Sequence, residues 1–390
     1  MNKRFYLGFV FLFMAALFLT TNAFAQYPGS KQWPLVEGTN VTFLLKADAA
    51  SDVQLYGDFL PGVNQYNLGG HVSMTRNGEG LWEYKAKNLP PDFYFYYFEV
   101  DGVRALDPNN LHLVCNYSEY FNSFLVKGPE SRNYEQTGVP AGTLVTHWYD
   151  SPEYGGQRRL NVWLPADYSE KNRYPVLYMI PGGGDDEDTW VDMGRLPQIM
   201  SHLTASGEAV PMIVVMVNAM PNQWAAPHVM DPIPGKKYHF ELMGTPEHAS
   251  GGEFANDMVN HIIPFIEKHY SVRADRNDRA VCGVSMGGVY ETYLLEHHPE
   301  LFGHIAYIGS GMMNTSPEEA DKKIAPLIKE GYRLMWIGAG SLDMALRSAK
   351  GLMEILDRHN MPYVYYDSGD GHNWRSWRRD LVQLAPKLFR

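Results

Sequence analysis

Seven apolar runs in the second half of the chain alternate with stretches of helical periodicity, and no other feature restricts the possible folds so strongly. The runs lie at residues 160–164, 176–180, 212–217, 280–284, 305–308, 334–337 and 363–366. Residues 253–269 and 344–359 are two of the helical stretches between them. Strands that are apolar throughout are buried on both faces, and the intervening helices cover those faces. We therefore predict an α/β fold over residues 143–390, with a mostly parallel sheet and helices on both sides.

The residues before this region follow a period of two instead. Short alternating runs lie at residues 41–45, 53–56, 81–84 and 93–100, with turn signals at Asn77-Gly78, Pro90-Pro91 and Asp101-Gly102. Many short strands separated by such turns are typical of an antiparallel β-sandwich. We predict an all-β sandwich over residues 26–130. Residues 131–142, which are rich in Gly, Pro and polar residues, are the predicted linker.

The N-terminus has the pattern of an export signal. An apolar run at residues 6–19 follows Lys3 and Arg4 and precedes Ala23-Phe24-Ala25, which has the small-x-small form that signal peptidase recognises. The run is shorter than the ~20 residues that a spanning helix needs, and no later stretch approaches that length. We predict a signal peptide over residues 1–25, a periplasmic or secreted protein, and no membrane span after processing.

Charge and cysteine content exclude several classes of protein. The formal net charge is -11, and basic residues form only short runs such as Arg378-Arg379. This balance argues against a nucleic-acid partner and against an anionic membrane, whereas a neutral polysaccharide is compatible with it. Cys115 and Cys282 lie in different predicted domains, so we expect no disulfide framework. No pattern specifies an oligomeric state.

The candidate catalytic motif is the segment Gly283-Val284-Ser285-Met286-Gly287. It follows the apolar run that begins at Ala280 and precedes a helical stretch, which is the strand-turn-helix setting of the nucleophile elbow in the α/β-hydrolase fold. We therefore predict that Ser285 is a nucleophile and that the Met286 N–H binds an oxyanion. The alternative is an ordinary Gly/Ser turn with a serine at the start of a helix.

A serine nucleophile needs a histidine base and an acid that orients the histidine. In this fold the chain order is serine, then acid, then histidine. The loop after the strand at residues 334–337 contains Asp343, and the loop after the last strand contains His372. We predict a Ser285, Asp343, His372 triad. Asp343 could instead cap a helix, and Asp367 and Asp370 are the alternative acids, disfavoured because they lie so close to His372 in the sequence.

A glycine-rich loop at residues 181–186 follows the strand at residues 176–180 and is the predicted source of the second oxyanion donor, the N–H of Gly183. The loop lacks the GxGxxG and GxxxxGK[ST] patterns of phosphate-binding loops, and two aspartates follow its glycines. HExxH and CxxC motifs are absent, and the adjacent His297 and His298 diverge on a helix. We predict no catalytic metal and no cofactor.

With these residues in place, the C-terminal part resembles the esterase D group of α/β-hydrolases, and within it the feruloyl and acetylxylan esterases of carbohydrate esterase family one. The motifs that carry the resemblance lie at residues 174–178, 185–190, 211–215, 265–270, 283–288, 336–338 and 371–374. Pro181 departs from the pattern, since many relatives have histidine before the loop glycine.

The N-terminal part resembles the immunoglobulin-like early-set domains related to glycogen-binding modules. The resemblance rests on residues 53–59, 82–83 and 93–102. Such a domain binds glycan or only packs beside the active site. Alternate residues of the aromatic stretch 93–98 point to opposite faces of a strand, which favours packing for at least half of them.

The family resemblance implies a serine esterase that hydrolyses feruloyl or acetyl esters on plant cell-wall polysaccharide (xylan), or hydroxycinnamoyl oligosaccharides, through an acyl-enzyme on Ser285. Trp190 and Trp374 are candidate walls for an aromatic acyl group or a sugar, with core packing as the alternative. Residues 218–252 form a long connection without clear periodicity, and a lid is one role that we consider for it.

Three other functions stay open. The first is a siderophore esterase of the enterochelin type, which also joins a β-domain to an esterase D domain. The second is a non-catalytic glycan-binding protein on an esterase scaffold. The third is acyl transfer to an alcohol, which would use the same triad.

Overall fold

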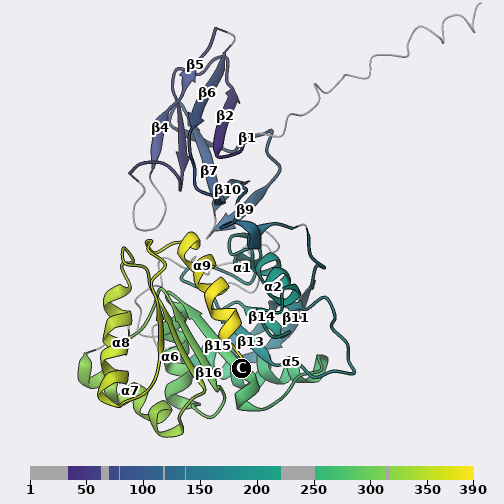
Figure 1. The fold of residues 1–390 in the computed structure, drawn as a ribbon, viewed down its shortest axis with the longest axis vertical. Coiled ribbons are helices and arrows are strands. Elements are labelled where there is room, and N and C mark those ends of the chain that lie inside the picture. The colour runs from purple at the N-terminus through teal and green to yellow at the C-terminus, as the bar shows by residue number, and fades with distance from the viewer. Residues whose placement is uncertain are drawn as a thin grey trace, which may run out of the picture.

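The computed structural model describes residues 34–62, 70–78, 80–116, 119–136, 138–220, 251–312 and 316–390. The predicted signal peptide and most of the long connection at residues 218–252 lie outside them. Figure 1 shows an elongated molecule in which a β-rich N-terminal part stands on a larger part built of a sheet and helices. No helix in the described ranges has both the length and the apolar character that crossing a membrane requires.

The N-terminal part is an antiparallel sandwich of two sheets. The first has the order β1 (Leu35–Glu37), β2 (Asn40–Lys46), β6 (Leu81–Ala86), β5 (Thr75–Arg76). The second has the order β4 (His71–Ser73), β3 (Val53–Gly57), β7 (Asp92–Val100), β10 (Glu119–Val126), β9 (Leu113–Asn116), with β8 (Val103–Ala105) paired to β7. Alternate residues of β2, such as Val41 and Phe43, pack inside against Tyr94, Tyr96 and Phe98 of β7. The predicted all-β sandwich is confirmed.

The larger part contains one sheet of eight strands. Its order is β11 (Thr143–Ser151), β12 (Gly156–Leu164), β14 (Ile213–Val217), β13 (Val176–Ile180), β15 (Arg279–Val284), β16 (His304–Ile308), β17 (Leu334–Gly338), β18 (Val364–Tyr366). The six strands from β14 to β18 run parallel to one another, and β12 pairs antiparallel with both of its neighbours, β14 and β11. The predicted mostly parallel sheet is therefore confirmed.

Helices cover both faces of this sheet. One face carries α1 (Thr189–Asp192), α2 (Leu196–Ala205) and α9 (Trp374–Leu384); the other carries α4 (Gly252–Asp257), α5 (Ile263–His269), α6 (Gly287–His297), α7 (Pro317–Glu330) and α8 (Leu346–Arg358). Successive side chains of β13 point to opposite faces of the sheet. Leu177 and Met179 pack against the first set of helices, and Tyr178 and Ile180 pack against the second. A π-helical turn, Met258–Ile262, separates α4 from α5.

The two parts share a core. Phe93 and Phe95, on the outer face of β7, pack in the same apolar cluster as Leu381 of α9 and Ile199 of α2. The connection between the parts is also packed: Tyr134, within the predicted linker, is 2% exposed, and its carbonyl accepts hydrogen bonds from the Arg195 guanidinium. Tyr134 therefore fixes this part of the connection to the larger part of the molecule through Arg195.

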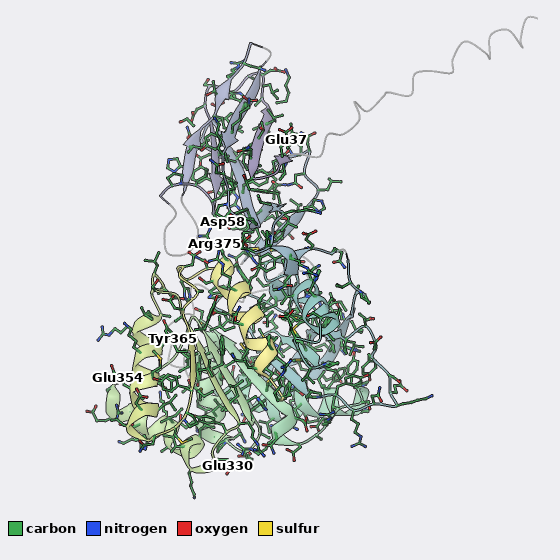
Figure 2. All side chains as sticks on the ribbon, viewed as in Figure 1. Glu37, Asp58, Glu330, Glu354, Tyr365 and Arg375 are labelled. Carbon is green, nitrogen blue, oxygen red and sulfur yellow. The ribbon has the colours of Figure 1, made fainter. Side chains whose placement is uncertain are left out.

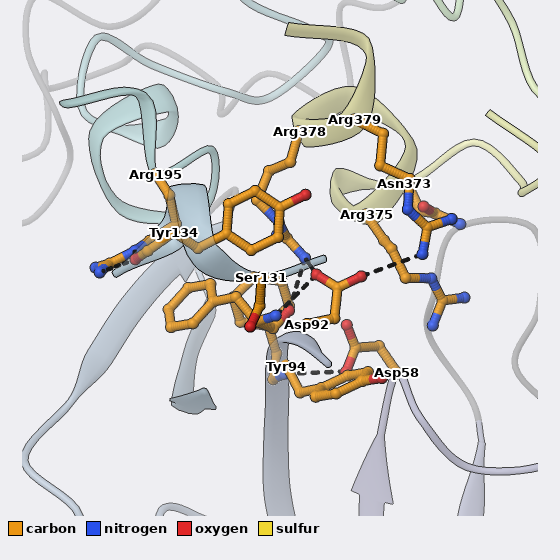
Figure 3. A network of polar contacts seen from close by, with 12 residues as sticks. Asp58, Asp92, Tyr94, Ser131, Tyr134, Arg195, Asn373, Arg375, Arg378 and Arg379 are labelled. Atoms are coloured by element: carbon orange, nitrogen blue, oxygen red, sulfur yellow. Dashed lines mark hydrogen bonds and ion pairs between the residues drawn. The ribbon is translucent and has the colours of Figure 1, made fainter. Parts of the chain in front are cut away.

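Asp58 lies in this interface and opposite Arg375 (Figures 2 and 3). Its Oδ1 accepts a hydrogen bond of 3.0 Å from the Phe95 N–H, while its Oδ2 is buried and has no partner among the described residues. Burial raises the pKa of this carboxyl to about 7, against the opposing effect of the positive charge on Arg375.

Asp58→Asn is expected to flatten the pH dependence of stability. The pKa in the folded state, about 7, lies above the ordinary value of 3.8. The folded chain therefore holds a proton that the unfolded chain has released, and stability falls as the pH rises from about 4 to 7, by up to about 1.4 kcal/mol per pH unit. Urea unfolding at pH 5, 6 and 7 measures this slope. The exposed-position control Glu37→Gln keeps the wild-type slope, and an unchanged slope in Asp58→Asn would contradict the assignment.

Candidate active site

The turn between β15 and α6 holds Ser285 in a left-handed backbone conformation with φ of 50°. Residues other than glycine rarely adopt this region, and they persist there only when the surroundings enforce it. Here the Ser285 N–H donates to the carbonyl of Ile308 at 2.9 Å, and the Ser285 carbonyl accepts from Ser310 Oγ at 2.7 Å. Ile308 is the last residue of the adjacent strand β16, and Ser310 comes two residues after it. The end of β16 therefore holds Ser285 in its turn.

Glycines on either side allow the turn to pack tightly. A Cβ atom on Gly287 would lie 2.5 Å from the carbonyl oxygens of Ile180 and Pro181. A Cβ atom on Gly283 would lie 2.5 Å from Glu291 Oε2. Both distances are too short for real carbon contacts, so the GxSxG spacing reflects the close approach of α6 to the ends of β13 and β15.

The structure brings the three predicted triad residues together in hydrogen-bonding order. Ser285 Oγ lies 2.8 Å from His372 Nε2, and His372 Nδ1 lies 2.9 Å from Asp343 Oδ1. His372 is 7% exposed and Asp343 6%. With the Nδ1 proton donated to Asp343, Nε2 is left to accept the Ser285 proton, which is the arrangement that a general base requires.

Asp343 and His372 are held by their own surroundings. The Ala345 N–H donates to Asp343 Oδ1 at 2.7 Å, and the Trp377 ring stands perpendicular to the imidazole with centroids 5.2 Å apart. Gly309 has φ of 52°, and a Cβ atom there would lie 3.1 Å from Asp343 Oδ2 and 3.3 Å from His372 Cε1. A side chain at Gly309 would therefore crowd both Asp343 and His372.

The two alternative acids bind backbone amides instead of the imidazole. Asp367 Oδ1 accepts from the N–H groups of Ser341 and Gly369 at 2.7 and 2.8 Å. Asp370 Oδ1 accepts from the Gly371 N–H at 2.8 Å. The geometry thus favours Asp343 over both as the partner of the base.

The predicted oxyanion donors lie beside the serine. Met286 directly precedes the first turn of α6, and the neighbouring loop approaches so closely that a Cβ atom on Gly182 would lie 3.5 Å from Ser285 Cβ. Within the described ranges, the N–H groups of Gly183 and Met286 make no hydrogen bond to another part of the chain. Their role as oxyanion donors stays a prediction.

Asp185 is buried at the end of the glycine loop and binds back to its first glycine, Gly182. Its N–H donates to the Gly182 carbonyl at 3.3 Å, and its side chain is 3% exposed. Burial and the neighbouring Asp186 raise the pKa of Asp185 well above its ordinary value, although the Gly182 N–H opposes this shift. The neutral acid is therefore the form that fits beneath the loop.

The sequence left two roles for Trp190 and Trp374, and the structure favours packing. Trp190 is 1% exposed and Trp374 5%, and the two rings meet edge to face with centroids 5.2 Å apart. Both belong to the core cluster that contains Phe93 of the sandwich. Because a substrate wall must present a ring face to the ligand, this burial favours core packing for both rings, and a substrate-binding role for them stays a prediction.

Glu291 is a residue of the site that the sequence did not reveal. It lies on α6, is fully buried, and its Oε2 accepts the Gly283 N–H at 2.8 Å. Burial raises the pKa of Glu291 well above its ordinary value, so the carboxyl packs in its neutral form beneath the elbow. No local pattern separates such a residue from the solvated glutamates common on helices. Among the described residues, no group of three or more histidine, cysteine, aspartate or glutamate side chains could hold a metal ion.

A serine on a strand-turn-helix elbow, bonded to a histidine and an aspartate that follow later strands of a mostly parallel sheet, is typical of the α/β-hydrolase class. The chain belongs to the esterase family: the family model named Esterase matches residues 151–388, more than half of the chain. This match confirms the resemblance inferred from the motifs.

Three known proteins illustrate the similarity. An Endo-1,4-beta-xylanase/feruloyl esterase of Xylanibacter ruminicola is 25% identical over 82% of this chain, which spans 42% of that relative's length. The structure of a CE1 ferulic acid esterase from Anaeromyces mucronatus, with ferulic acid bound, has a TM-score of 0.55 at 25% identity; the match covers 67% of this chain and 96% of the other. The enterobactin esterase of Shigella flexneri has a TM-score of 0.62 at 16% identity, and the match covers 90% of this chain and 93% of the other, a likeness of fold.

Asp343→Asn is expected to lower kcat by about 10³- to 10⁴-fold with little change in KM, because the amide cannot hold the imidazole in the tautomer that accepts the serine proton. The matched control is Asp367→Asn, which removes a carboxylate from the same loop as His372 at a side chain that binds the N–H groups of Ser341 and Gly369 and not the imidazole. Hydrolysis of an aryl acetate measures both. An equal loss in the two variants would show that Asp343 is not the acid of the triad.

Proposed function

We propose that this protein is an exported serine esterase that hydrolyses feruloyl or acetyl esters on plant cell-wall polysaccharide such as xylan. The observation that carries the proposal is the continuous hydrogen-bonded series from Ser285 Oγ through His372 to Asp343. The proposed organisation is a signal peptide over residues 1–25, a sandwich over 26–130, a connection over 131–142 and an esterase domain over 143–390. Export rests on the N-terminal pattern alone.

The geometry supports a two-step reaction. Ser285 Oγ attacks the ester carbonyl carbon while its proton passes to His372 Nε2, and the N–H groups of Gly183 and Met286 stabilise the oxyanion. The bond from this carbon to the sugar oxygen then breaks, and His372 gives its proton to the leaving hydroxyl group. A water molecule attacks the acyl-serine, again losing its proton to His372, which returns it to Ser285 Oγ as the carboxylic acid departs.

The substrate class is supported by the relatives rather than by a described binding pocket. A feruloyl esterase function is part of the name of the Xylanibacter ruminicola relative, and ferulic acid is bound in the Anaeromyces mucronatus structure. The net charge of -11 is compatible with a neutral polysaccharide partner.

A siderophore esterase is the second candidate, because the match to the enterobactin esterase covers 90% of this chain and so includes the sandwich. That likeness is one of fold. A ferric catecholate substrate is anionic, and an acidic protein attracts it less than a neutral glycan ester. We therefore rank this candidate below the polysaccharide esterase.

The aromatic stretch at residues 93–98 gives little support to a non-catalytic glycan-binding protein. Tyr94, Tyr96 and Phe98 fill the sandwich core, and Phe93 and Phe95 pack against the esterase part. The remaining ring, Tyr97, stacks on Tyr56 with centroids 4.8 Å apart, and Arg104 Cζ lies 3.9 Å from its centroid. Sugars stack on exposed ring faces, whereas the Tyr97 ring already stacks with Tyr56 and lies against the Arg104 guanidinium.

Ser285→Ala is expected to abolish ester hydrolysis and labelling by a fluorophosphonate probe, because both require the Oγ nucleophile. Labelling followed by mass spectrometry of the modified peptide locates the reactive serine. The control is Ser310→Ala, which keeps the nucleophile and is expected to be labelled, only more slowly. Wild-type protein that resists the probe would exclude a serine esterase and favour the glycan-binding alternative.

A substrate panel distinguishes the two esterase candidates. We expect release of ferulate from methyl ferulate and feruloylated arabinoxylan oligosaccharide, or of acetate from acetylated xylan, measured by chromatography of the released acid. A ferric catecholate ester is the comparison substrate. Hydrolysis of that ester alone would overturn the polysaccharide assignment and leave the serine mechanism intact.

A further inference from the structure

The loop that carries His372 is tied to the sandwich through a chain of charged side chains. This loop, residues 367–373, lies between β18 and α9 and has no helix or strand of its own. A base on such a loop must be held within a fraction of an ångström of its serine, since a displacement of about 1 Å can lower a rate by about 10²-fold. The contacts that hold this loop therefore bear directly on catalysis.

Asp370 is the centre of these contacts. Its Oδ1 accepts from the Gly371 N–H at 2.8 Å and from Asn373 Nδ2 at 3.1 Å, so its carboxylate grips both neighbours of His372. Its own carbonyl accepts from the Leu342 N–H at 3.2 Å, one residue before Asp343. One residue thus joins the loop of the base to the loop of the acid.

Two arginines of α9 hold Asp370 in turn. Arg375 donates to both of its carboxylate oxygens, and Arg379 Nη1 lies 3.5 Å from Oδ2. Burial disfavours the charged form of Asp370, but the hydrogen bond and the positive charge of Arg375 outweigh it, so the pKa stays below its ordinary value. Asp370 is therefore an anion at neutral pH, and the two arginines supply the positive charge that it needs.

The chain continues into the sandwich at Asp92, the first residue of β7 (Figure 3). Asp92 Oδ2 lies 3.3 Å from Arg379 Nη2, and its Oδ1 accepts from Arg378 Nη2 at 2.9 Å. The side chains of Asp92 and Arg378 are 2% and 0% exposed. Arg378 also donates to the carbonyls of Phe93 and Met193, at 2.6 and 3.0 Å, so it bridges the two parts of the molecule.

We propose that Asp92 is a positioning residue for the esterase reaction, acting through Arg379 and Asp370 to hold the loop of His372, so that the sandwich is part of the catalytic apparatus. The inference rests on the proposed function. Asp92 touches no reacting atom. It orients the first turns of α9, and α9 begins two residues after His372. A carboxylate on one domain therefore helps to set the distance between base and nucleophile on the other.

A purely stabilising interface is the rival explanation, and the split between kcat and KM separates the two. Asp92→Asn keeps the size of the side chain but loses its charge, and we expect kcat for an aryl acetate to fall about 10- to 100-fold with KM within about twofold. The matched control is Asp107→Asn. Asp107 is also buried in the sandwich, and it accepts hydrogen bonds from Tyr96 and Asn109, both within the sandwich. Its variant is expected to lose stability and keep kcat.

Arg379 supplies a second variant that does not depend on the folding of the first, because its side chain is 35% exposed. Arg379→Gln is expected to lower kcat by a similar factor, and Arg379→Lys to restore part of it. In the Asp92→Asn, Arg379→Gln double variant the loss is expected to be close to that of one single variant, since both break the same chain. Independent, multiplying losses would overturn the proposal, as would a kcat within twofold of wild type in Arg379→Gln.

The rate of fluorophosphonate labelling of Ser285 is the second readout, since it reports the base without any polysaccharide. If wild type is labelled but does not cleave feruloyl or acetyl substrates, the substrate assignment fails, and slower labelling of the Arg379→Gln variant still supports the positioning role. Equal labelling rates in wild type and variant would contradict it. If wild type is not labelled, the serine esterase assignment fails and the inference fails with it.

Discussion

The left-handed backbone of Ser285 is the constraint on which the rest of the site depends. A serine is held in that conformation only where its surroundings determine it, and here Ile308, the last residue of β16, accepts from its N–H while Ser310, just after β16, donates to its carbonyl. The same turn sets the start of α6, which must then pass so close to β13 that only glycine fits at Gly287. The order of strands β13, β15 and β16 in the sheet therefore determines the position of the Ser285 side chain.

Two kinds of buried or half-buried carboxyl group support the elbow and the loop of His372. Glu291 and Asp185 lie beneath the turn and the glycine loop, where burial raises the pKa of each and favours the neutral form. Asp370 and Asp92 are paired with arginines of α9. Buried ion pairs add little net stability because desolvation offsets their attraction. Their value here is orientation, since a carboxylate that grips two directional donors permits few arrangements of the loop beside His372.

The sequence predicted best those elements whose own residues show a clear pattern of apolar and polar side chains. The buried strand β13 has the predicted bounds, and β15 differs from them by one residue, because a strand covered on both faces is apolar throughout. Strand β11 was not predicted, since it lies at the edge of the sheet and most of its residues are exposed or half-buried. Trp190 and Trp374 could not be assigned from the sequence, because a ring in a core and a ring on a binding wall have the same local surroundings.

The sequence by itself determined the order of the elements and the chemistry available to them. Ser285, Asp343 and His372 each follow a recognisable strand, and parallel strands bring their carboxyl ends to one edge of a sheet, so a triad of these three residues could be predicted without coordinates. Only the tertiary structure decided what holds that triad in place. Asp92 and Arg378 are 286 residues apart, and no periodicity or motif connects residues at such a distance. Their contact exists because the sandwich packs against α9, and that packing is a property of the folded surfaces rather than of any local pattern.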